Sequence, residues 1–273
     1  MVLPLQQQWW LVLLPLLVHI VTLNLPLISC FVARPRAVHR KTWQPNHLAK
    51  GSKNTKPNKD DILWVEKGLK EERGLFPILG SDESGRGCVA GPVVAATCAI
   101  LCADWSHYSP IPNVRDSKEL STEERLEIYQ HVMAHPEVYI WSVAERSNTR
   151  IDETNIMIAS MECFKESIEQ VALRLPNTQN AYSIVDGKKG PKLSIDLPSR
   201  PWVQGDKEVY SVALASILAK VTRDQMAEEW HVQFPEYGFL EHKGYATRDH
   251  IEAIHKYGPS PIHRLSFKTL KGR

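Results

Sequence analysis

Two hydrophobic periods alternate along the second part of the chain. Short apolar runs, which fit buried strands, occur at residues 77–82, 93–101, 139–147, 181–187 and 201–206. Apolar residues at helical spacing occur at residues 115–136, 152–175, 209–234 and 247–258. This order predicts one α/β domain with a central mixed β-sheet flanked by helices and a further helix at the C-terminal end. The first two runs follow one another directly, so we expect them to pair as antiparallel neighbours.

Local signals mark the starts of two predicted helices. Ser121 and Glu124 have the spacing of a capping box at the start of the first helix. Asp152 is the expected cap of one long helix that continues to residue 175. The apolar stripe of that long helix is assigned to core packing rather than to a cofactor site.

The N-terminal part of the chain has a different composition. Residues 9–32 contain no Lys, Arg, Asp or Glu, but prolines and an asparagine interrupt this apolar stretch. We therefore assign residues 1–32 to a hydrophobic, cleavable signal-type leader and residues 33–70 to a basic, transit-like segment and disordered linker. The catalytic domain is expected to span residues 71–273, and the mature form is expected to have no membrane partner.

Charge is distributed unevenly between these parts. Residues 1–59 hold eight Lys or Arg and no Asp or Glu, whereas the rest of the chain carries a net charge of −6. The apolar, then acid-free leader resembles the two-part leaders of plastids with extra membranes. We expect an organelle protein, with the plastid favoured and the mitochondrion as the alternative; a disordered basic tail is the third interpretation. Any nucleic-acid binding should depend on local basic patches and weaken as salt rises.

Three of the predicted strands end in acidic residues. Asp82 and Glu83 follow the first run, and Asp186 and Asp206 end the last two. Ligands collect at the carboxyl ends of strands in open α/β sheets, where clustered acids would repel one another unless a divalent cation neutralised them. Oxygen ligands suit Mg²⁺ or Mn²⁺, and two such ions can cleave a phosphodiester. Neighbouring strand residues point to opposite faces, so we expect the backbone to bend after Asp82 and Glu83, at Ser84-Gly85.

Six sequence blocks then identify a family that the chain resembles. In chain order they are DESGRGCVAGPVVAA, VRDSKELSTEER, RIDETNI, IVDGKKGPKL, GDKEVYSVALASILAKVTRD and HKGYATRDHIEAIHKYGPSPIHRLSF. Together, from about residue 78 to 268, they resemble ribonuclease HII, the type 2 ribonuclease H family. The resemblance implies a ribonuclease H-like fold and a metal-dependent endoribonuclease that uses Mg²⁺ or Mn²⁺. Its expected partners are RNA–DNA hybrids and duplex DNA containing ribonucleotides, which such enzymes cut during DNA replication and repair to leave 5′-phosphate and 3′-hydroxyl ends.

The resemblance also assigns roles to individual positions. Asp82, Glu83, Asp186 and Asp206 match the four catalytic, metal-binding acids. Gly85, Arg86 and Gly87 match the motif that contacts the ribose 2′-hydroxyl, and Tyr245 matches the tyrosine that packs against the sugar on the 3′ side and favours a deoxyribose. Lys118 is a weaker candidate for substrate binding, and Lys188, Lys189, Lys220 and Arg223 are further candidates for phosphate contacts. The chain departs from the family pattern at Ser84, Cys88 and Ala246; the Cys88 thiol could make the enzyme sensitive to oxidation.

Two alternatives stay open at this point. The first is a catalytically idle nucleic-acid-binding module on the same fold, against which the presence of all four acids argues. The second is a ribonuclease HIII-like enzyme, a family that carries an extra N-terminal substrate-binding domain. We expect a monomer, and we see no Gln-led, aromatic-ended peptide of the sliding-clamp type. The five cysteines have neither zinc-site spacing nor the pattern of a disulfide framework.

Overall fold

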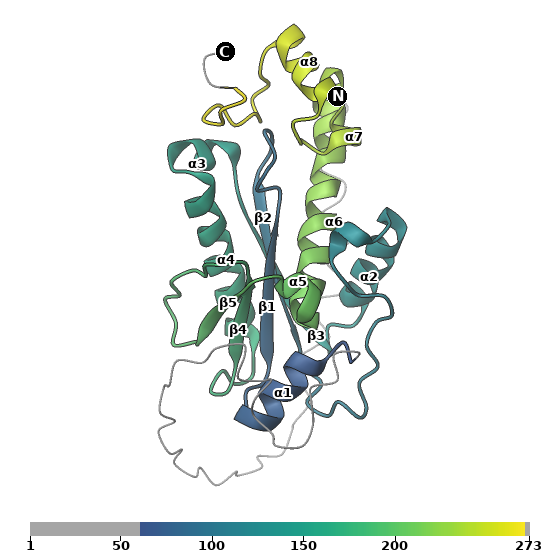
Figure 1. Cartoon of the computed structure of the whole chain (residues 1–273), viewed down its shortest axis with the longest axis vertical. Helices are drawn as coiled ribbons and strands as arrows, with labels where there is room; N and C mark the ends of the chain where they lie inside the picture. The colour runs from purple at the N-terminus through teal and green to yellow at the C-terminus, as the bar shows by residue number, and fades with distance from the viewer. Residues whose placement is uncertain (1–60, 271–273) are drawn as a thin grey trace, which may run out of the picture. The chain divides into compact units, whose positions relative to one another are not determined.

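Five strands form one mixed sheet at the centre of the described residues, 61–270, of a computed structural model (Figure 1). The strands are β1 (Ile78–Ser84), β2 (Val93–Ile100), β3 (Tyr139–Arg146), β4 (Tyr182–Asp186) and β5 (Ser199–Trp202). Their order in the sheet is β3-β2-β1-β4-β5. β1, β2 and β3 pair antiparallel, whereas β1, β4 and β5 run parallel. The predicted mixed sheet and the predicted antiparallel first pair are therefore confirmed.

Helices cover both faces of this sheet. The helices are α1 (Trp64–Arg73), α2 (Thr122–Ala134), α3 (Asn148–Glu153), α4 (Ile156–Arg174), α5 (Gly205–Glu208), α6 (Tyr210–Gln233), α7 (Phe239–His242) and α8 (Arg248–Tyr257). α6 packs against β1 and β2 with α2 beside it, and α4 packs on the other face against β2 and β3 (Figure 1). The C-terminal helices α7 and α8 form the expected extension near the end of α6.

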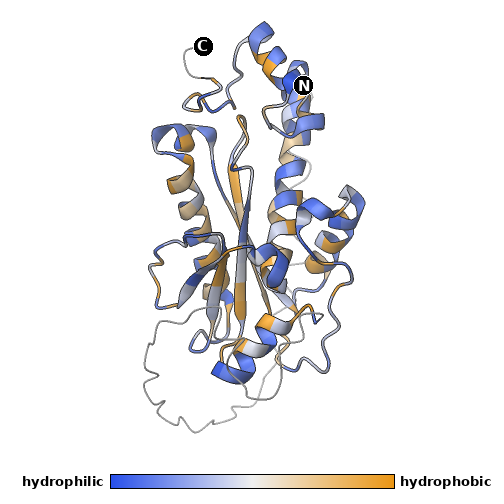
Figure 2. Cartoon of the chain, viewed as in Figure 1, coloured by the Kyte–Doolittle hydropathy of each residue, from blue (hydrophilic) through white to orange (hydrophobic). Residues whose placement is uncertain are grey.

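The two covered faces explain why β2 is apolar throughout. Val94, Ala96 and Cys98 belong to the core under α6, whereas Val93 and Ala95 belong to the core under α4. Successive strand residues point to opposite faces, so a strand covered on both sides needs a continuous apolar run. Figure 2 shows this apolar character along the central strands and a mixed character on the covering helices.

A close approach between β1 and α6 sets the position of the acidic edge. A Cβ added at Gly80 would lie 2.2 Å from the backbone carbon of Ser211, in the first turn of α6. Only a glycine lets two backbones approach so closely. The contact brings the buried face of α6 against the strand that carries Asp82 and Glu83.

The long helix predicted from Asp152 to residue 175 is two helices. α3 ends at Glu153, and α4 begins after Asn155, whose side chain accepts a hydrogen bond from the Ile158 amide at 3.0 Å. Asp152 caps neither helix; its carboxylate instead accepts hydrogen bonds from the C-terminal segment that includes Leu265. The prediction was wrong because the apolar period continues across the break, while the cap residue lies three positions later. The capping box of Ser121 and Glu124 at the start of α2 is confirmed.

The folded part of the chain begins earlier than the predicted boundary at residue 71. We assigned residues 61–70 to a disordered linker, but α1 begins at Trp64 and buries Val65, Glu66 and Leu69. The helix is amphipathic, with Val65 and Leu69 on its buried face, and Glu66 ties it to α6. The predicted leader (1–32) and the rest of the transit-like segment lie outside the described residues. Within residues 61–270 no helix has both the length and the apolar character needed to cross a membrane.

The buried Glu66 carboxyl makes folding stability depend on pH. Its Oε1 accepts hydrogen bonds from the Ser211 amide at 2.9 Å and hydroxyl at 3.0 Å, while Oε2 is buried with no hydrogen-bond partner among residues 61–270. Burial raises the pKa of Glu66 from 4.5 to about 7. Because the folded pKa is the higher one, the stabilisation from proton binding is complete below pH 4.5 and is lost as pH rises to about 7.

We expect Glu66→Gln to remove this pH dependence. Glutamine keeps the acceptor for Ser211 and mimics the protonated acid, so the variant should gain stability over the wild type as pH rises. The gain between pH 5 and pH 8 should approach about 3 kcal/mol, the free energy that corresponds to the raised pKa. Urea unfolding of both proteins at the two pH values measures it; a difference that does not change with pH would contradict the expectation.

Candidate active site

Parallel strands bring acidic side chains to one edge of the sheet. Asp82 and Glu83 lie near the end of β1, and Asp186 is the last residue of β4. Since β1 and β4 are parallel and Ser81 pairs with Val185, Asp82 and Asp186 follow at neighbouring positions. The carboxyl ends of the two strands therefore place these acids together, as the sequence predicted.

The fourth acid, Asp206, reaches this edge from a short helix rather than from a strand end. β5 ends at Trp202, and the chain turns through Gln204, which has a φ of +61°, into α5. The Gly205 amide donates a hydrogen bond to Asp186 Oδ1 at 2.7 Å, which joins this turn to β4. The expectation that Asp206 ends a strand was wrong, because the strand signal of residues 201–206 includes the turn that follows the strand.

The backbone does not bend between Asp82 and Glu83, and of the expected bend at Ser84-Gly85 only Gly85 takes part, since Ser84 is still in β1. β1 stays paired with β2 through its last residue, and a positive φ of +86° first occurs at Gly85. Asp82 is nearly buried and makes a hydrogen bond with Ser216 of α6. Its neighbour Glu83 is held instead by Arg86, whose Nη1 lies 3.1 Å from Glu83 Oε1. Different partners thus hold the two adjacent acids.

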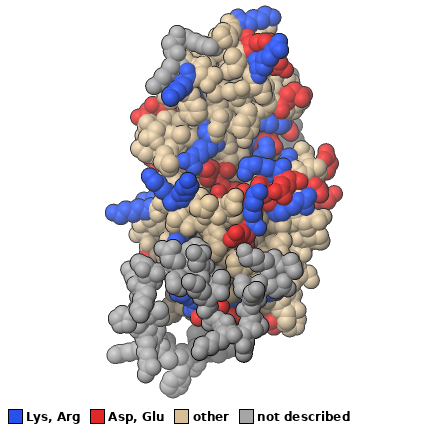
Figure 3. All heavy atoms as spheres, in the orientation of Figure 1, with Lys and Arg blue, Asp and Glu red and all other residues tan. Residues whose placement is uncertain are grey.

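Burial and mutual repulsion raise the pKa of three of these carboxyls. Burial is the main cause for Asp82, and the nearby charges of Glu83 and Asp186 raise its pKa further. For Asp186, burial is followed by repulsion from Asp206. Burial and the Asp186 charge also raise the pKa of Glu83, although the Arg86 hydrogen bond opposes them. The four acids are therefore close enough to repel one another, and Figure 3 shows acidic atoms gathered at the middle of this face with basic side chains around them.

The donor chemistry of this cluster fits a hard divalent cation. All four side chains offer carboxylate oxygens, which Mg²⁺ and Mn²⁺ prefer. Within residues 61–270, no three His, Cys, Asp or Glu side chains already stand in a metal-ligand arrangement. Burial is the main cause of the raised pKa values of Asp82 and Asp186, but neighbouring carboxylates add to both, and a bound cation would relieve that repulsion.

Lys118 lies beside the acids, as its candidate role requires. It belongs to a short 3₁₀ helix (Ser117–Glu119), and its Nζ lies 3.5 Å from Asp116 Oδ1 and 3.6 Å from Asp206 Oδ2. Burial lowers the pKa of Lys118, but the carboxylates of Asp116, Asp206 and Asp82 more than offset this and raise it. The side chain remains 75% exposed, so its ammonium is open to a substrate.

Sequence reasoning missed Ser216 of α6, which links Asp82 to the 3₁₀ helix that carries Lys118. Its hydroxyl lies 2.7 Å from that of Ser117, next to Lys118, and it also makes a hydrogen bond with Asp82. The available signal was a serine inside the apolar run of α6, since buried hydroxyls need a partner.

The two glycines of the Gly-Arg-Gly motif have different surroundings. A Cβ at Gly85 would lie 2.0 Å from Arg223 Nε, whereas a Cβ at Gly87 would have nothing within 4 Å. Between them, Arg86 contacts Glu83 and places its Nη2 3.5 Å from the Met157 sulfur. Gly85 is therefore required by packing, while Gly87 leaves exposed backbone that a substrate can approach.

Two buried arginines, Arg223 and Arg264, donate hydrogen bonds to backbone carbonyls in and after the Gly-Arg-Gly loop. Arg223 is 1% exposed and donates hydrogen bonds to the carbonyl oxygens of Pro92, Lys243 and Ala90. It therefore cannot contact a phosphate, which corrects the sequence prediction. Arg264 is fully buried and donates to the carbonyl oxygens of Gly91, Arg86 and Pro92.

Tyr245 lies on the loop between α7 and α8, next to the Gly-Arg-Gly motif. The Val89 amide donates to the Gly244 carbonyl at 2.9 Å, so backbone pairing joins the two loops. The Tyr245 side chain is 44% exposed and lies close to the Cys88 thiol. Cys88 itself is fully buried and burial raises its pKa, so the expected sensitivity to oxidation has no structural support.

Comparison with known proteins identifies relatives over most of the described residues. The sequence model of the family described as Ribonuclease HII matches residues 79–270. A ribonuclease HII of Rhizobium etli is 41% identical over 199 residues, which cover 72% of this chain and 80% of that protein. A ribonuclease HII of Chlamydia pneumoniae is 42% identical over 210 residues, covering 77% of this chain and 91% of the relative.

Solved structures show the same fold. RNase HII in a PCNA:RNase HII complex from Archaeoglobus fulgidus has a TM-score of 0.56 at 26% identity, covering 71% of this chain and 96% of that one. Bst-RNase HIII in complex with Mn²⁺ has a TM-score of 0.59 at 20% identity, covering 71% and 68%, and shows the fold alone. The predicted ribonuclease H-like fold is confirmed.

Proposed function

This chain belongs to the ribonuclease HII family, and we propose that it hydrolyses the RNA strand of RNA–DNA hybrids and cuts at ribonucleotides embedded in duplex DNA. One observation carries the proposal: the four acids share a strand edge with the Gly-Arg-Gly loop, which is itself paired with the Tyr245 loop. Groups suited to cleavage and groups suited to sugar recognition are thus held side by side.

We assign the four acids Asp82, Glu83, Asp186 and Asp206 to binding Mg²⁺ or Mn²⁺, with two ions proposed. When bound, the metal supplies charge neutralisation at the phosphate and an activated water as nucleophile. The protein contributes the orientation of these groups: the Gly205 amide holds Asp186, Arg86 holds Glu83, and Lys118 lies beside Asp206.

Recognition of the ribonucleotide is assigned to the neighbouring loops. The exposed backbone around Gly87 can approach a sugar closely, and the 2′-hydroxyl is the group that distinguishes RNA from DNA. Arg86, 41% exposed, supplies positive charge at the same place. The exposed Tyr245 ring offers a flat surface for the sugar on the 3′ side.

The alternatives carry less support. A ribonuclease HIII-like enzyme shares the fold. However, the matching family model is that of ribonuclease HII, and the relatives near 40% identity are ribonucleases HII. An idle binding module gives no reason for four mutually repelling carboxylates at one edge. We further propose that the enzyme is monomeric. On the composition of residues 1–59 we propose an organelle location, with the plastid favoured over the mitochondrion.

The full chain should cut two duplexes, one with a single embedded ribonucleotide and one with a continuous RNA strand. Cleavage should require Mg²⁺ or Mn²⁺, stop in excess EDTA and return when Mg²⁺ exceeds the chelator, because the acids need a cation to bind a phosphate. Gel analysis of end-labelled strands measures both products and their termini. Cutting that continues in EDTA, or binding without any cutting under all metal conditions, would refute the proposal.

A further inference from the structure

Three buried histidines lie beneath the Tyr245 loop. His242 and His250 stack with ring centroids 4.0 Å apart, and His250 Nε2 lies 3.0 Å from His263 Nε2. Phe239 and Tyr237 pack around these rings. None of the three histidines lies at the acidic edge, so the mechanism above does not use them.

The partners of two histidines determine which nitrogen atoms carry protons. The Ser260 backbone amide and hydroxyl lie 2.8 and 2.7 Å from His263 Nδ1, and because the amide can only donate, that nitrogen accepts. At the other end, the Tyr245 carbonyl can only accept, and it lies 2.8 Å from His250 Nδ1, so that nitrogen donates. In two neutral rings, His263 Nε2 must then carry the proton that is donated to His250 Nε2. The result is one directional chain of hydrogen bonds from Ser260 through His263 and His250 to Tyr245, here called the histidine relay.

Burial keeps this relay in its neutral form. His250 and His263 are at most 1% exposed, and burial lowers the pKa of each to about 4. A proton added to either ring would put two N–H groups face to face or remove the acceptor of the Ser260 amide. The relay therefore has a single arrangement near neutral pH.

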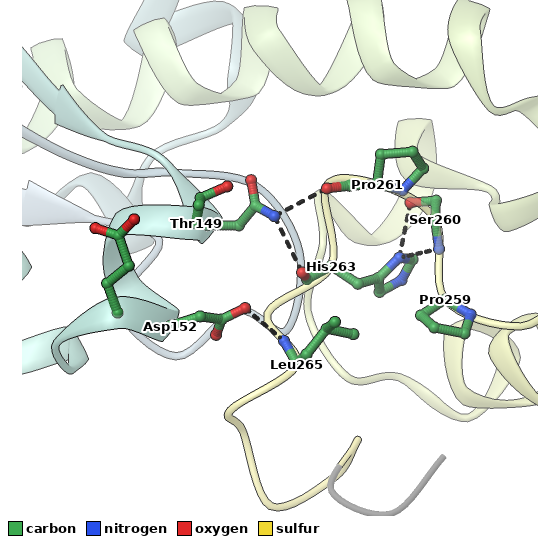
Figure 4. A pocket seen from close by; sticks show the side chains of 9 residues that line it. Thr149, Asp152, Pro259, Ser260, Pro261, His263 and Leu265 are labelled. Carbon is green, nitrogen blue, oxygen red and sulfur yellow. Dashed lines mark hydrogen bonds between the residues drawn. The ribbon is translucent and has the colours of Figure 1, made fainter.

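Hydrogen bonds to α3 hold the segment that contains Ser260 and His263, where the relay starts. Asn148 of α3 donates to the carbonyls of Pro261 and His263, at 2.9 and 3.1 Å, and Asp152 accepts from the Leu265 amide. Figure 4 shows the His263 ring directed at Ser260 and Asp152 directed at Leu265. These residues line a hollow of about 620 Å³ between α3 and this segment. None of the four acids lines the hollow, and one of its walls is the anchored segment.

Arg264, the residue after His263, contacts the Gly-Arg-Gly loop. Arg264 donates to the Arg86 carbonyl at 3.3 Å, and its own amide donates to the Val89 carbonyl at 2.8 Å. Adjacent residues thus support both loops: His263 supports Tyr245 through His250, and Arg264 supports the Gly-Arg-Gly motif directly.

We propose that the His263-Arg264 pair is a positioning device that holds the Tyr245 loop in register with the Gly-Arg-Gly loop and thereby sets the preference for a deoxyribose on the 3′ side of the cut. This rests on the proposed function, since it concerns the sugar specificity of the same site. His263 and His250 touch no reacting atom on this account and act only through the Tyr245 backbone.

His263→Phe tests the proposal in the full chain. Phenylalanine keeps the ring contact with Tyr237 but removes both nitrogens of the relay. Amide hydrogen exchange at Tyr245 and Thr247 should become about tenfold faster, consistent with the loss of one buried hydrogen bond. The ratio of kcat/KM for the embedded ribonucleotide to that for the continuous RNA strand should fall by about tenfold. His263→Gln keeps a donor toward His250, so its exchange rate and its substrate ratio should both lie between those of the wild type and His263→Phe.

Val171→Ala is the matched control, because it removes buried volume in α4, away from both loops. It should lower global stability and leave both the Tyr245 exchange rate and the substrate ratio unchanged. An unchanged ratio in His263→Phe would overturn the proposal, whether or not the loop exchanges faster. A ratio that falls equally in Val171→Ala would overturn it too, since general destabilisation would then be the cause. Failure of the wild-type chain to cut either duplex is a separate result, which would refute the proposed function while the exchange rates still report on the relay.

Discussion

Asp186→Asn should abolish nearly all cleavage while leaving substrate binding intact. Asp186 lies between β1 and α5, where it is coupled to Asp82 and Asp206, so losing its charge weakens the cation site at its centre. Removing one group that stabilises developing charge typically costs about 10²–10³-fold in kcat, and we expect a loss at or above that range. Single-turnover cleavage with saturating protein measures the chemical step, and a filter-binding titration measures affinity.

The same substitution should stabilise the metal-free protein. Asparagine keeps the acceptor for the Gly205 amide but removes a buried charge whose repulsion raises the pKa of Asp82. Thermal unfolding in EDTA should therefore occur at a higher temperature in the variant than in the wild type. Asp104→Asn, the same chemical change in an exposed loop, is the control for cleavage and should leave it unchanged. Undiminished cleavage by Asp186→Asn would refute the assignment of the acids.

Gly85→Ala and Gly87→Ala should separate packing from recognition within one motif. At Gly85 the backbone has a φ of +86°, which costs an alanine about 1–2 kcal/mol. The new methyl group would also displace Arg223 from its three carbonyl partners. We expect Gly85→Ala to lower the free energy of unfolding by at least about 2 kcal/mol. The variant should also lose cleavage of both duplexes.

Gly87→Ala should behave differently, because a Cβ there enters open space. Its stability should stay within about 0.5 kcal/mol of the wild type. Its KM for the embedded ribonucleotide should rise, since a methyl group would keep the backbone away from the sugar. Urea unfolding and steady-state kinetics on both variants test the pair. Equal stability losses would contradict the packing role of Gly85, and wild-type kinetics in Gly87→Ala would contradict close approach to the substrate.

Local pattern was enough to predict most elements of the fold. The capping box at Ser121, the run of β2 and the apolar start of α6 each involve neighbours in sequence, and each was confirmed. One error arose where the decisive partner was distant. Asp152 has the residue type of a helix cap, but its partners are amides of the C-terminal segment. The error at α1 was a local one, because its basic last turn and the Gly74 that follows are helix-end signals that the assignment to a linker overlooked.

The sequence by itself determined the chemical content of this protein: which carboxylates exist, that they follow strand-like runs, and that Gly-Arg-Gly comes next to two of them. Only the tertiary structure decided how these groups meet. Parallel pairing of β1 with β4 puts Asp186 beside Asp82, and the buried Arg223 explains why residue 85 must be glycine. The support from His263 and Arg264 also appears only in the fold, because their partners are mostly backbone carbonyls and amides. Every residue has a backbone carbonyl and all but proline an amide, so no pattern of side chains could have revealed the contacts.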